Sequence, residues 1–210
     1  MGRPMQFEAD TAVDKAMDLF WRQGYAGTTP QELASELGIG KGSLYNTFES
    51  KHALFMRALR RYSEIRLEYL TDLFSAPGPI APRLKGAMTV LAGVDAHQRG
   101  CVMVNAAAEL GTADDEVNRI AEDLFTRIEA VFRQAIAQGQ ESGEFRRDRD
   151  AETAASQLLA SVVGLSVLVN AGGPSERFPA VIEGIVEGLV RAGHADAVKS
   201  SMPAAIATSR

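Results

Sequence analysis

Two short helical segments joined by a tight turn constrain the fold of this chain more than any other sequence feature. Thr29 and Glu32 form a capping box around a proline at the first helical position, which predicts a helix from Pro30 to about Leu37. The run Gly38-Ile39-Gly40 then ends this helix, because glycine adopts a positive φ at no steric cost. A second short helix is predicted from Lys41 to about Phe48.

A longer helix is predicted just before this pair. It begins near Glu8 and Asp10, whose charges suit a helix N-terminus, and it ends at Gly24. Five apolar residues at helical spacing give it one buried face: Val13, Ala16, Met17, Phe20 and Trp21. Together the three helices indicate a helix-turn-helix unit, in which the helix after the turn lies in the major groove of DNA.

The helix predicted from Lys41 to Phe48 has one apolar face and one polar face. Leu44 and Phe48 are four residues apart and face inward, which leaves the other side chains for DNA. The hydroxyl of Ser43 and the amide of Asn46 can exchange hydrogen bonds with base edges. The predicted DNA contacts within this helix are Lys41, Gly42, Ser43, Tyr45 and Asn46.

Residues on both sides of this helix are predicted to hold the phosphate backbone of the DNA. Thr28 and Thr29 offer hydroxyl and amide groups, and Lys51 offers a positive charge at the start of the next helix. Two alternatives stay open. Tyr45 could instead be a partly buried core aromatic, and helix capping alone is enough to explain Thr29.

Charge is unevenly distributed along the chain. The formal net charge of -5 argues against a protein that coats nucleic acid indiscriminately. Residues 1–66 carry 9 basic and 8 acidic side chains, whereas residues 67–210 carry 13 basic and 19 acidic ones. A slightly basic front end is compatible with a localised DNA-contacting surface.

A wider run of residues resembles the TetR/AcrR family of bacterial repressors. The run consists of Gly24-Tyr25-Ala26-Gly27-Thr28-Thr29, Leu33-Ala34, the segment from Gly38 to Phe48, Ser50-Lys51 and Leu54. The resemblance spans roughly residues 7–60. It implies a dimer that binds a palindromic operator in double-stranded DNA through the helix beginning at Lys41, and a C-terminal domain that senses a small-molecule effector.

The rest of the chain is predicted to be a helical bundle, so the expected fold class is all-α. Ser50 is the predicted N-cap of a long helix that reaches about Leu73, before Pro77-Gly78-Pro79 stops it. Further helices are expected at about Ala81 to His97, Cys101 to Leu110, Asp115 to Gly139, Asp150 to Asn170 and Pro179 to Ala192. The expected division is a helix-turn-helix domain at 1–49, a ligand-binding and dimerisation domain at 50–195, and a disordered tail at 196–210.

The last two predicted helices form a candidate dimer surface. The segment from Leu158 to Val169 is apolar around more of its circumference than a surface helix needs, so a second covering layer is expected. Gly184 and Gly188, four residues apart in the final helix, permit close helix approach. A homodimer supplies this layer and places two recognition helices one DNA turn apart, about 34 Å, or a multiple of it. The alternative is that these faces pack within one chain.

An apolar cavity in the bundle is the expected effector site. The residues predicted to line it are Met88, Leu91, Met103, Val104, Phe125, Ile128 and Phe132. Asn105 or Glu109 would fix the orientation of the bound compound.

Cys101 is the only cysteine in the chain, so neither an intramolecular disulfide nor a zinc site is expected. Three interpretations of its thiol are open. It is an inert core residue, or it is part of the effector site and reacts with electrophiles or oxidants near Arg99. In the third, it binds Cu(I) with His97 and a methionine, for which the ligand count is poor. No cofactor is expected.

Other classes of function are less well supported by the sequence. An enzyme would need His97 and Cys101 as base and nucleophile, but Gly100 interrupts them and no orienting acid or oxyanion motif is evident. A helical interaction adaptor is the main alternative, and it would lack salt-dependent binding to promoter DNA. The N-terminus has no leader-like segment, and the most apolar run, about a dozen residues, is shorter than the roughly 20 that span a membrane. A cytoplasmic protein without a membrane span is therefore expected.

Overall fold

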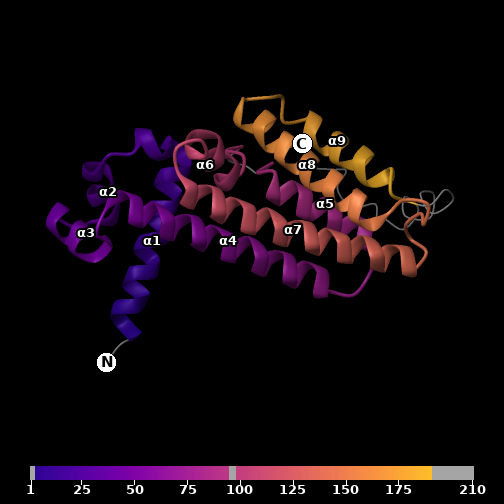
Figure 1. Ribbon diagram of the computed structural model, residues 1–210, viewed down its shortest axis with the longest axis horizontal. Coiled ribbons are helices and arrows are strands. Elements are labelled where there is room, and N and C mark those ends of the chain that lie inside the picture. The colour runs from indigo at the N-terminus through magenta and orange to yellow at the C-terminus, as the bar shows by residue number, and fades with distance from the viewer. Residues whose placement is uncertain (1–2, 95–97, 191–210) are drawn as a thin grey trace, which may run out of the picture.

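The computed structural model describes residues 3–94 and 98–190, with side chains described from Asp10 onward. Within these residues the fold is all-α, as predicted, apart from an isolated antiparallel bridge between Phe145 and Val190. The helices are α1 (Arg3–Gly27), α2 (Pro30–Leu37), α3 (Lys41–Phe48), α4 (Lys51–Ser75), α5 (Ile80–Leu91), α6 (Val102–Leu110), α7 (Asp115–Glu141), α8 (Ala151–Asn170) and α9 (Arg177–Glu187) (Figure 1).

The short helices α2 and α3 begin and end where the sequence predicts. The N–H of Glu32 donates to Thr29 Oγ1 at 3.2 Å and the N–H of Thr29 donates to Glu32 Oε2 at 2.8 Å, which completes the capping box. Gly38 takes a φ of 69° and ends α2 in the left-handed conformation. In α3, Leu44 and Phe48 are buried and fix the helix against the core.

The first helix breaks at Gly24, where the sequence predicts its end. Gly24 has a φ of 75° and a ψ of 172°, and the chain then makes one further turn to Gly27 before α2. Glycine reaches this conformation without the steric cost that a Cβ would bring. The helix begins at Arg3, several residues earlier than expected. The turn after Gly24 is therefore a separate short unit that needs support from outside α1.

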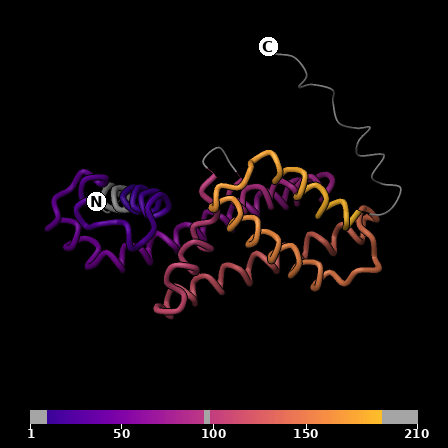
Figure 2. The backbone as a smooth tube through the Cα atoms, turned by 90° about the horizontal axis from the view of Figure 1, so that it is seen from above, coloured from indigo at the N-terminus to yellow at the C-terminus, as the bar shows by residue number. Residues whose placement is uncertain are grey.

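The long helix α4 joins the two ends of the molecule. It packs against α1 and α3 and also against α5, α6 and α7. Figure 2 shows α1 to α3 gathered at one end and α5 to α9 at the other, with α4 running between them. One cluster of buried apolar residues extends from Val13 in α1 to Leu189, so the described part of the chain has a continuous core.

The helix predicted from Ala81 to His97 is shorter in the structure, where α5 ends at Leu91. Gly93 takes a φ of 70°, and a Cβ at this glycine would lie 2.3 Å from the backbone oxygen of Gly100. The backbone at Gly93 lies so close to the backbone at Gly100 that the helix does not continue. His97 lies outside the described residues, as does the predicted tail at 196–210.

The final helix also differs from its predicted range of Pro179 to Ala192, since α9 spans Arg177–Glu187. After α9 the chain turns, Val190 pairs with Phe145, and the N–H of Arg146 donates to the Leu189 oxygen at 2.9 Å. These backbone contacts end the helix before its predicted bound, and the last two residues of the predicted range lie outside the described residues.

By length and composition alone, α8 is apolar enough to cross a membrane, with a mean hydropathy of 1.5. The expectation of no span rested on a shorter segment inside this helix. A core helix of a soluble protein meets the same criterion, and α8 packs against α5, α6 and α7. The hydropathy of α8 is therefore weak evidence for a membrane span.

Candidate DNA-binding surface and ligand cavity

The polar face of α3 is exposed along its whole length. Lys41, Gly42, Ser43 and Asn46 all lie at the surface, opposite the buried Leu44 and Phe48. The side chain of Tyr45 is 44% exposed. Tyr45 is therefore not the core aromatic that one interpretation of the sequence allows.

Thr28 departs from its predicted place on this surface. Its side chain is 0% exposed, and its hydroxyl donates to the Gly24 carbonyl oxygen at 2.7 Å. The expectation of a phosphate contact through this hydroxyl is wrong for this conformation, because the group already satisfies a carbonyl at the break in α1. Thr28 therefore stabilises the turn between Gly24 and Gly27 through this hydrogen bond.

Thr29 and Lys51 are placed beside α3 and have partners within the protein. The N–H of Thr29 and its hydroxyl both donate to Glu32, and these bonds hold the pKa of the Glu32 carboxyl below its ordinary value. The Lys51 ammonium lies 4.2 Å from the centre of the Tyr25 ring. Burial lowers the pKa of Lys51, against the opposing attraction of Glu109 and Glu32.

A carboxylate from α6 holds the turn that follows Gly24. Glu109 Oε2 accepts the N–H of Tyr25 at 2.9 Å, and Glu109 Oε1 accepts the N–H of Ala26 at 2.6 Å. From the sequence we expect Glu109 beside a bound compound, but in the structure both of its oxygens accept hydrogen bonds from the backbone of the turn after Gly24. A carboxylate that accepts two N–H groups is a strong, charge-assisted contact.

Arg99, just before α6, makes a second link to α1. Its guanidinium pairs with Asp18 at 2.8 Å and lies 4.3 Å from the centre of the Trp21 ring. Trp21 Nε1 and Asn105 Nδ2 both donate to the Arg99 carbonyl oxygen, at 3.3 and 3.1 Å. Asn105 therefore lies in the cleft between α1, α6 and α8, away from the cavity that it was predicted to line.

His52 and Asp114 link α4 to the start of α7. Their side chains are 2.7 Å apart, and Asp114 is also the N-cap of α7, where it accepts the N–H groups of Glu116 and Val117. The hydrogen bond to His52 and these backbone bonds hold the pKa of Asp114 below its ordinary value. Sequence spacing gives no signal for this pair, because 62 positions separate its members.

A small cavity of about 10 Å³ lies between α4, α6, α7 and α8, room for about one water molecule. Its walls are Tyr62, Arg66, Leu91, Cys101, Val104, Leu124, Phe125, Ile128, Leu159, Val162 and Val163. Five of the residues predicted to line a ligand site are among them: Leu91, Cys101, Val104, Phe125 and Ile128. Met88, Met103 and Phe132 are fully buried in the core but do not line this cavity.

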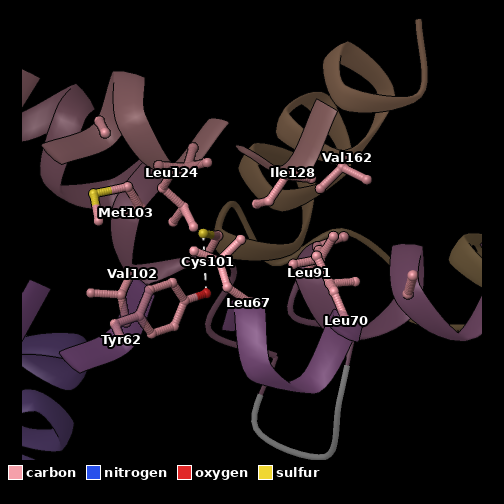
Figure 3. Packing of buried hydrophobic residues seen from close by; sticks show 14 of the residues in the cluster. Tyr62, Leu67, Leu70, Leu91, Cys101, Val102, Met103, Leu124, Ile128 and Val162 are labelled. Carbon is pink, nitrogen blue, oxygen red and sulfur yellow. Dashed lines mark hydrogen bonds between the residues drawn. The ribbon is translucent and has the colours of Figure 1, made fainter. Parts of the chain in front are cut away.

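Cys101 is buried at the N-cap position of α6, with 6% of its surface exposed. The Tyr62 hydroxyl donates to the Cys101 sulfur at 3.1 Å, as Figure 3 shows. The backbone N–H of Cys101 donates to Ser166 Oγ at 2.7 Å. Among the described residues, no group of three or more His, Cys, Asp or Glu side chains could hold a metal ion. The burial favours an inert thiol over one open to solvent.

Three large apolar side chains remain exposed on the last two helices. Val167 and Leu168 of α8 are 52% and 54% exposed, and Val181 of α9 is 42% exposed. The other large aliphatic and aromatic residues of these helices are buried or half-buried. Exposed apolar side chains on adjoining helices are typical of a surface that a partner covers.

Sequence comparisons agree with this arrangement. Residues 12–58 match the family described as bacterial regulatory proteins, tetR family, and residues 81–192 match the tetracyclin repressor-like C-terminal domain. The HTH-type transcriptional repressor DhaR of Mycobacterium sp. (strain GP1) is 31% identical over 72% of this chain and 77% of its own length. The HTH-type transcriptional repressor ComR of Escherichia coli (strain K12) is 27% identical over 84% of this chain and 86% of its own length.

A solved structure extends the likeness to three dimensions. A cysteine mutant of the TetR family transcriptional regulator CifR, complexed with a 26-base-pair operator DNA, has a TM-score of 0.70 and 30% identity. The similarity covers 86% of this chain and 95% of that protein. Two matched domains that together span the DNA-binding end and the bundle leave one conclusion: this chain belongs to the TetR family of bacterial regulatory proteins.

Proposed function

We propose that this chain is a transcriptional repressor that binds a palindromic operator as a homodimer and releases it when a small molecule enters the bundle. The observation that carries the proposal is α3, whose apolar residues are buried while its polar face is free. The relatives DhaR and ComR are named repressors, and CifR has been solved on operator DNA. A regulator of this kind is not an enzyme and acts in the cytoplasm.

The proposed DNA contacts are those of the exposed surface around α3. Ser43 and Asn46 read base edges, and Gly42 lets the backbone come close to the groove. Lys41, Tyr45, Thr29 and Lys51 hold phosphates through charge, hydroxyl and amide groups. Thr28 is left out of this set because its side chain is fully buried, whereas Thr29 is exposed even though its hydroxyl and N–H donate to Glu32.

The proposed dimer forms through α8 and α9. Val167, Leu168 and Val181 would be covered by the same surface of a second copy, since a two-fold interface repeats each patch. Gly184 lies on the same helix as Val181 and no other group lies within 4 Å of where its Cβ would be, so another helix can approach there.

We keep the division into residues 1–49, 50–195 and 196–210 as a proposal about function, with DNA binding in the first part and sensing and dimerisation in the second. The two parts share α4 and a continuous apolar core. A change in the bundle would therefore reach the DNA-binding end through packed elements.

The proposed coupling runs through α6. Cys101 and Val104, at the start of α6, form part of the cavity wall, and Glu109 near its end holds the turn at Tyr25 and Ala26. A ligand that widens the cavity would shift α6 and α4 and change the distance between the two recognition helices. The ligand must bind one arrangement better than the other, and such couplings are typically about 1 to 3 kcal/mol.

A gel-shift titration at a stated salt concentration tests the proposal, with the DNA upstream of the gene and a random-sequence competitor. We expect saturable binding to a palindrome, weakened by Ser43→Ala and by Asn46→Ala. Gln134→Ala, on the exposed face of α7, is the matched control and should bind like the unmodified protein. No preference over random DNA, even after selection from a random pool, would favour the adaptor function instead.

A further inference from the structure

The surface open to the cavity in the bundle is apolar, and polar residues border the cavity at one corner only. Tyr62 and Arg66, one turn apart on α4, are its polar members, and Arg66 is its only charged member. The cavity is part of the site proposed above for the effector, so the inference below rests on that proposed function.

Arg66 interacts with the Tyr62 hydroxyl, but one of its own N–H groups is left without a partner. Its Nε is buried and has no hydrogen-bond acceptor. Its guanidinium lies 4.8 Å from the centre of the Tyr62 ring and 5.8 Å from that of Trp21. Within the described part of the chain, no carboxylate forms an ion pair with it. A buried N–H without an acceptor costs free energy, and an arriving oxygen atom would recover that cost.

The hydroxyl of Tyr62 adds a second donor at the same corner. It donates to the sulfur of Cys101 at 3.1 Å, and a thiol sulfur is a weak acceptor. Burial raises the pKa of Tyr62 well above its ordinary value, so the hydroxyl keeps its proton and remains a donor. A carboxylate oxygen is a much better acceptor than sulfur and would take this hydrogen bond.

The opposite side of the cavity offers hydrocarbon surface. Ile128 and Val162 are buried, whereas Phe125, Leu159 and Val163 are partly exposed at the surface. Partly exposed apolar side chains at the wall of a cavity can turn aside more readily than buried ones, because less packing is lost. The cavity can therefore open on this side and leave the polar corner in place.

We propose that the cavity binds an apolar organic acid, with its carboxylate on Arg66 and Tyr62 and its hydrocarbon body against Phe125, Leu159 and Val163. The volume of about 10 Å³ holds no such molecule as it stands, so binding widens the cavity. Cys101 and Val104 at the start of α6 also form part of the cavity wall, so a widening that displaces them supplies the movement that the proposed coupling to the DNA-binding end requires.

The fluorescence of Trp21 provides a direct readout of binding. Trp21 is the only tryptophan in the chain, and the Arg66 guanidinium lies near its ring, so a carboxylate on Arg66 changes the surroundings of the indole. The purified full-length protein is titrated with two acid and amide pairs: hexanoate with hexanamide, and 3-phenylpropionate with 3-phenylpropanamide. Each amide matches the shape of its acid but lacks the charge.

We expect each acid to bind at least about tenfold more tightly than its amide, as a charge-assisted hydrogen bond predicts. The preference should disappear in Arg66→Met and persist in part in Arg66→Lys. Arg133→Met, on an exposed part of α7, is the matched control and should keep the full preference. Circular dichroism checks folding, and Arg66→Gln makes the same comparison if Arg66→Met does not fold.

Equal affinity for acid and amide would overturn the proposal, and so would a preference for the acid that survives in Arg66→Met. The absence of a saturable change in Trp21 fluorescence with any of the four compounds would overturn it as well. Operator binding is followed in parallel by gel shift. Normal operator binding without acid binding would contradict only the acid site. Acid binding that leaves operator affinity unchanged would support the acid site and contradict its role as the effector site.

Discussion

Glu109 in α6 accepts the backbone N–H of Ala26 at 2.6 Å, although 83 positions separate the two residues in the chain. The same carboxylate accepts the N–H of Tyr25. A side chain of the bundle thus completes the backbone hydrogen bonds of the turn that precedes α2. We therefore expect the orientation of α3 to depend on this residue of the bundle.

Replacing Glu109 by glutamine tests this dependence. An amide keeps one acceptor oxygen but presents N–H₂ to the second backbone donor, so we expect a loss of about 1 kcal/mol of unfolding free energy, limited by solvent exposure. Operator affinity should fall more than this stability change explains, and the affinity should respond less to effector. Urea unfolding and gel shifts on the same samples give both values. Glu122→Gln, exposed on α7, should leave both unchanged.

Thr29→Ala should destabilise the DNA-binding end by about 1 kcal/mol, because the side chain that caps α2 is lost. Thr29→Ser keeps the capping oxygen and should recover most of this stability. Thermal unfolding followed by circular dichroism makes the comparison. If serine is as unstable as alanine, the methyl group and not the cap stabilises the turn.

Leu168→Glu should convert the proposed dimer to monomers and abolish operator binding, because each copy would bury an unpaired charge in the interface. Light scattering after size-exclusion chromatography gives the mass of each species. Thr126→Glu adds the same charge on the exposed face of α7 and should leave the mass and the binding unchanged. A dimer that persists in Leu168→Glu would place the interface elsewhere.

Asp114 predicts a defined dependence of stability on pH. Its folded-state pKa is lowered, chiefly by the hydrogen bond to His52. Its contribution is therefore complete above the unfolded-state pKa, about 3.9, and is lost as the pH falls through the lower folded-state value. Urea unfolding between pH 3 and pH 6 should show this loss in the unmodified protein. In Asp114→Asn, which keeps an N-cap oxygen, this part of the pH dependence should be absent.

The buried Cys101 thiol should react with a disulfide reagent such as DTNB only as fast as the bundle opens. Reaction should be slow in the folded protein and immediate in urea. A folded-state rate close to that of a free thiol would instead favour the electrophile-responsive interpretation of the sequence.

The sequence is a good guide where structure depends on near neighbours. The capping box, the φ of Gly38 and the inward positions of Leu44 and Phe48 are local properties, and the bounds of α2 and α3 are confirmed to the residue. The exposure of Tyr45 does not follow from spacing alone, since it lies three positions before Phe48 at the edge of the apolar face, and it is the structure that shows it to be exposed.

Residues whose partners lie far along the chain could not be placed in this way. Thr28 and Glu109 are polar residues near a predicted site, and nothing in their spacing shows that each already binds the backbone around Gly24. Likewise, Met88 and Met103 are predicted to line the cavity but lie in the solid core, because periodicity cannot separate a cavity wall from core packing.

The hydrogen bonds of Glu109 also bear on protein engineering. A chimera that joins residues 1–49 of this chain to a sensor bundle without a carboxylate at the place of Glu109 keeps the break at Gly24 but loses the group that holds it. In such a hybrid the DNA-binding part would be joined to the bundle correctly, but α3 would be held in a less well-defined orientation. Transplanting specificity between members of this family therefore requires grafting a matched acceptor into the recipient's α6, in addition to the reader itself.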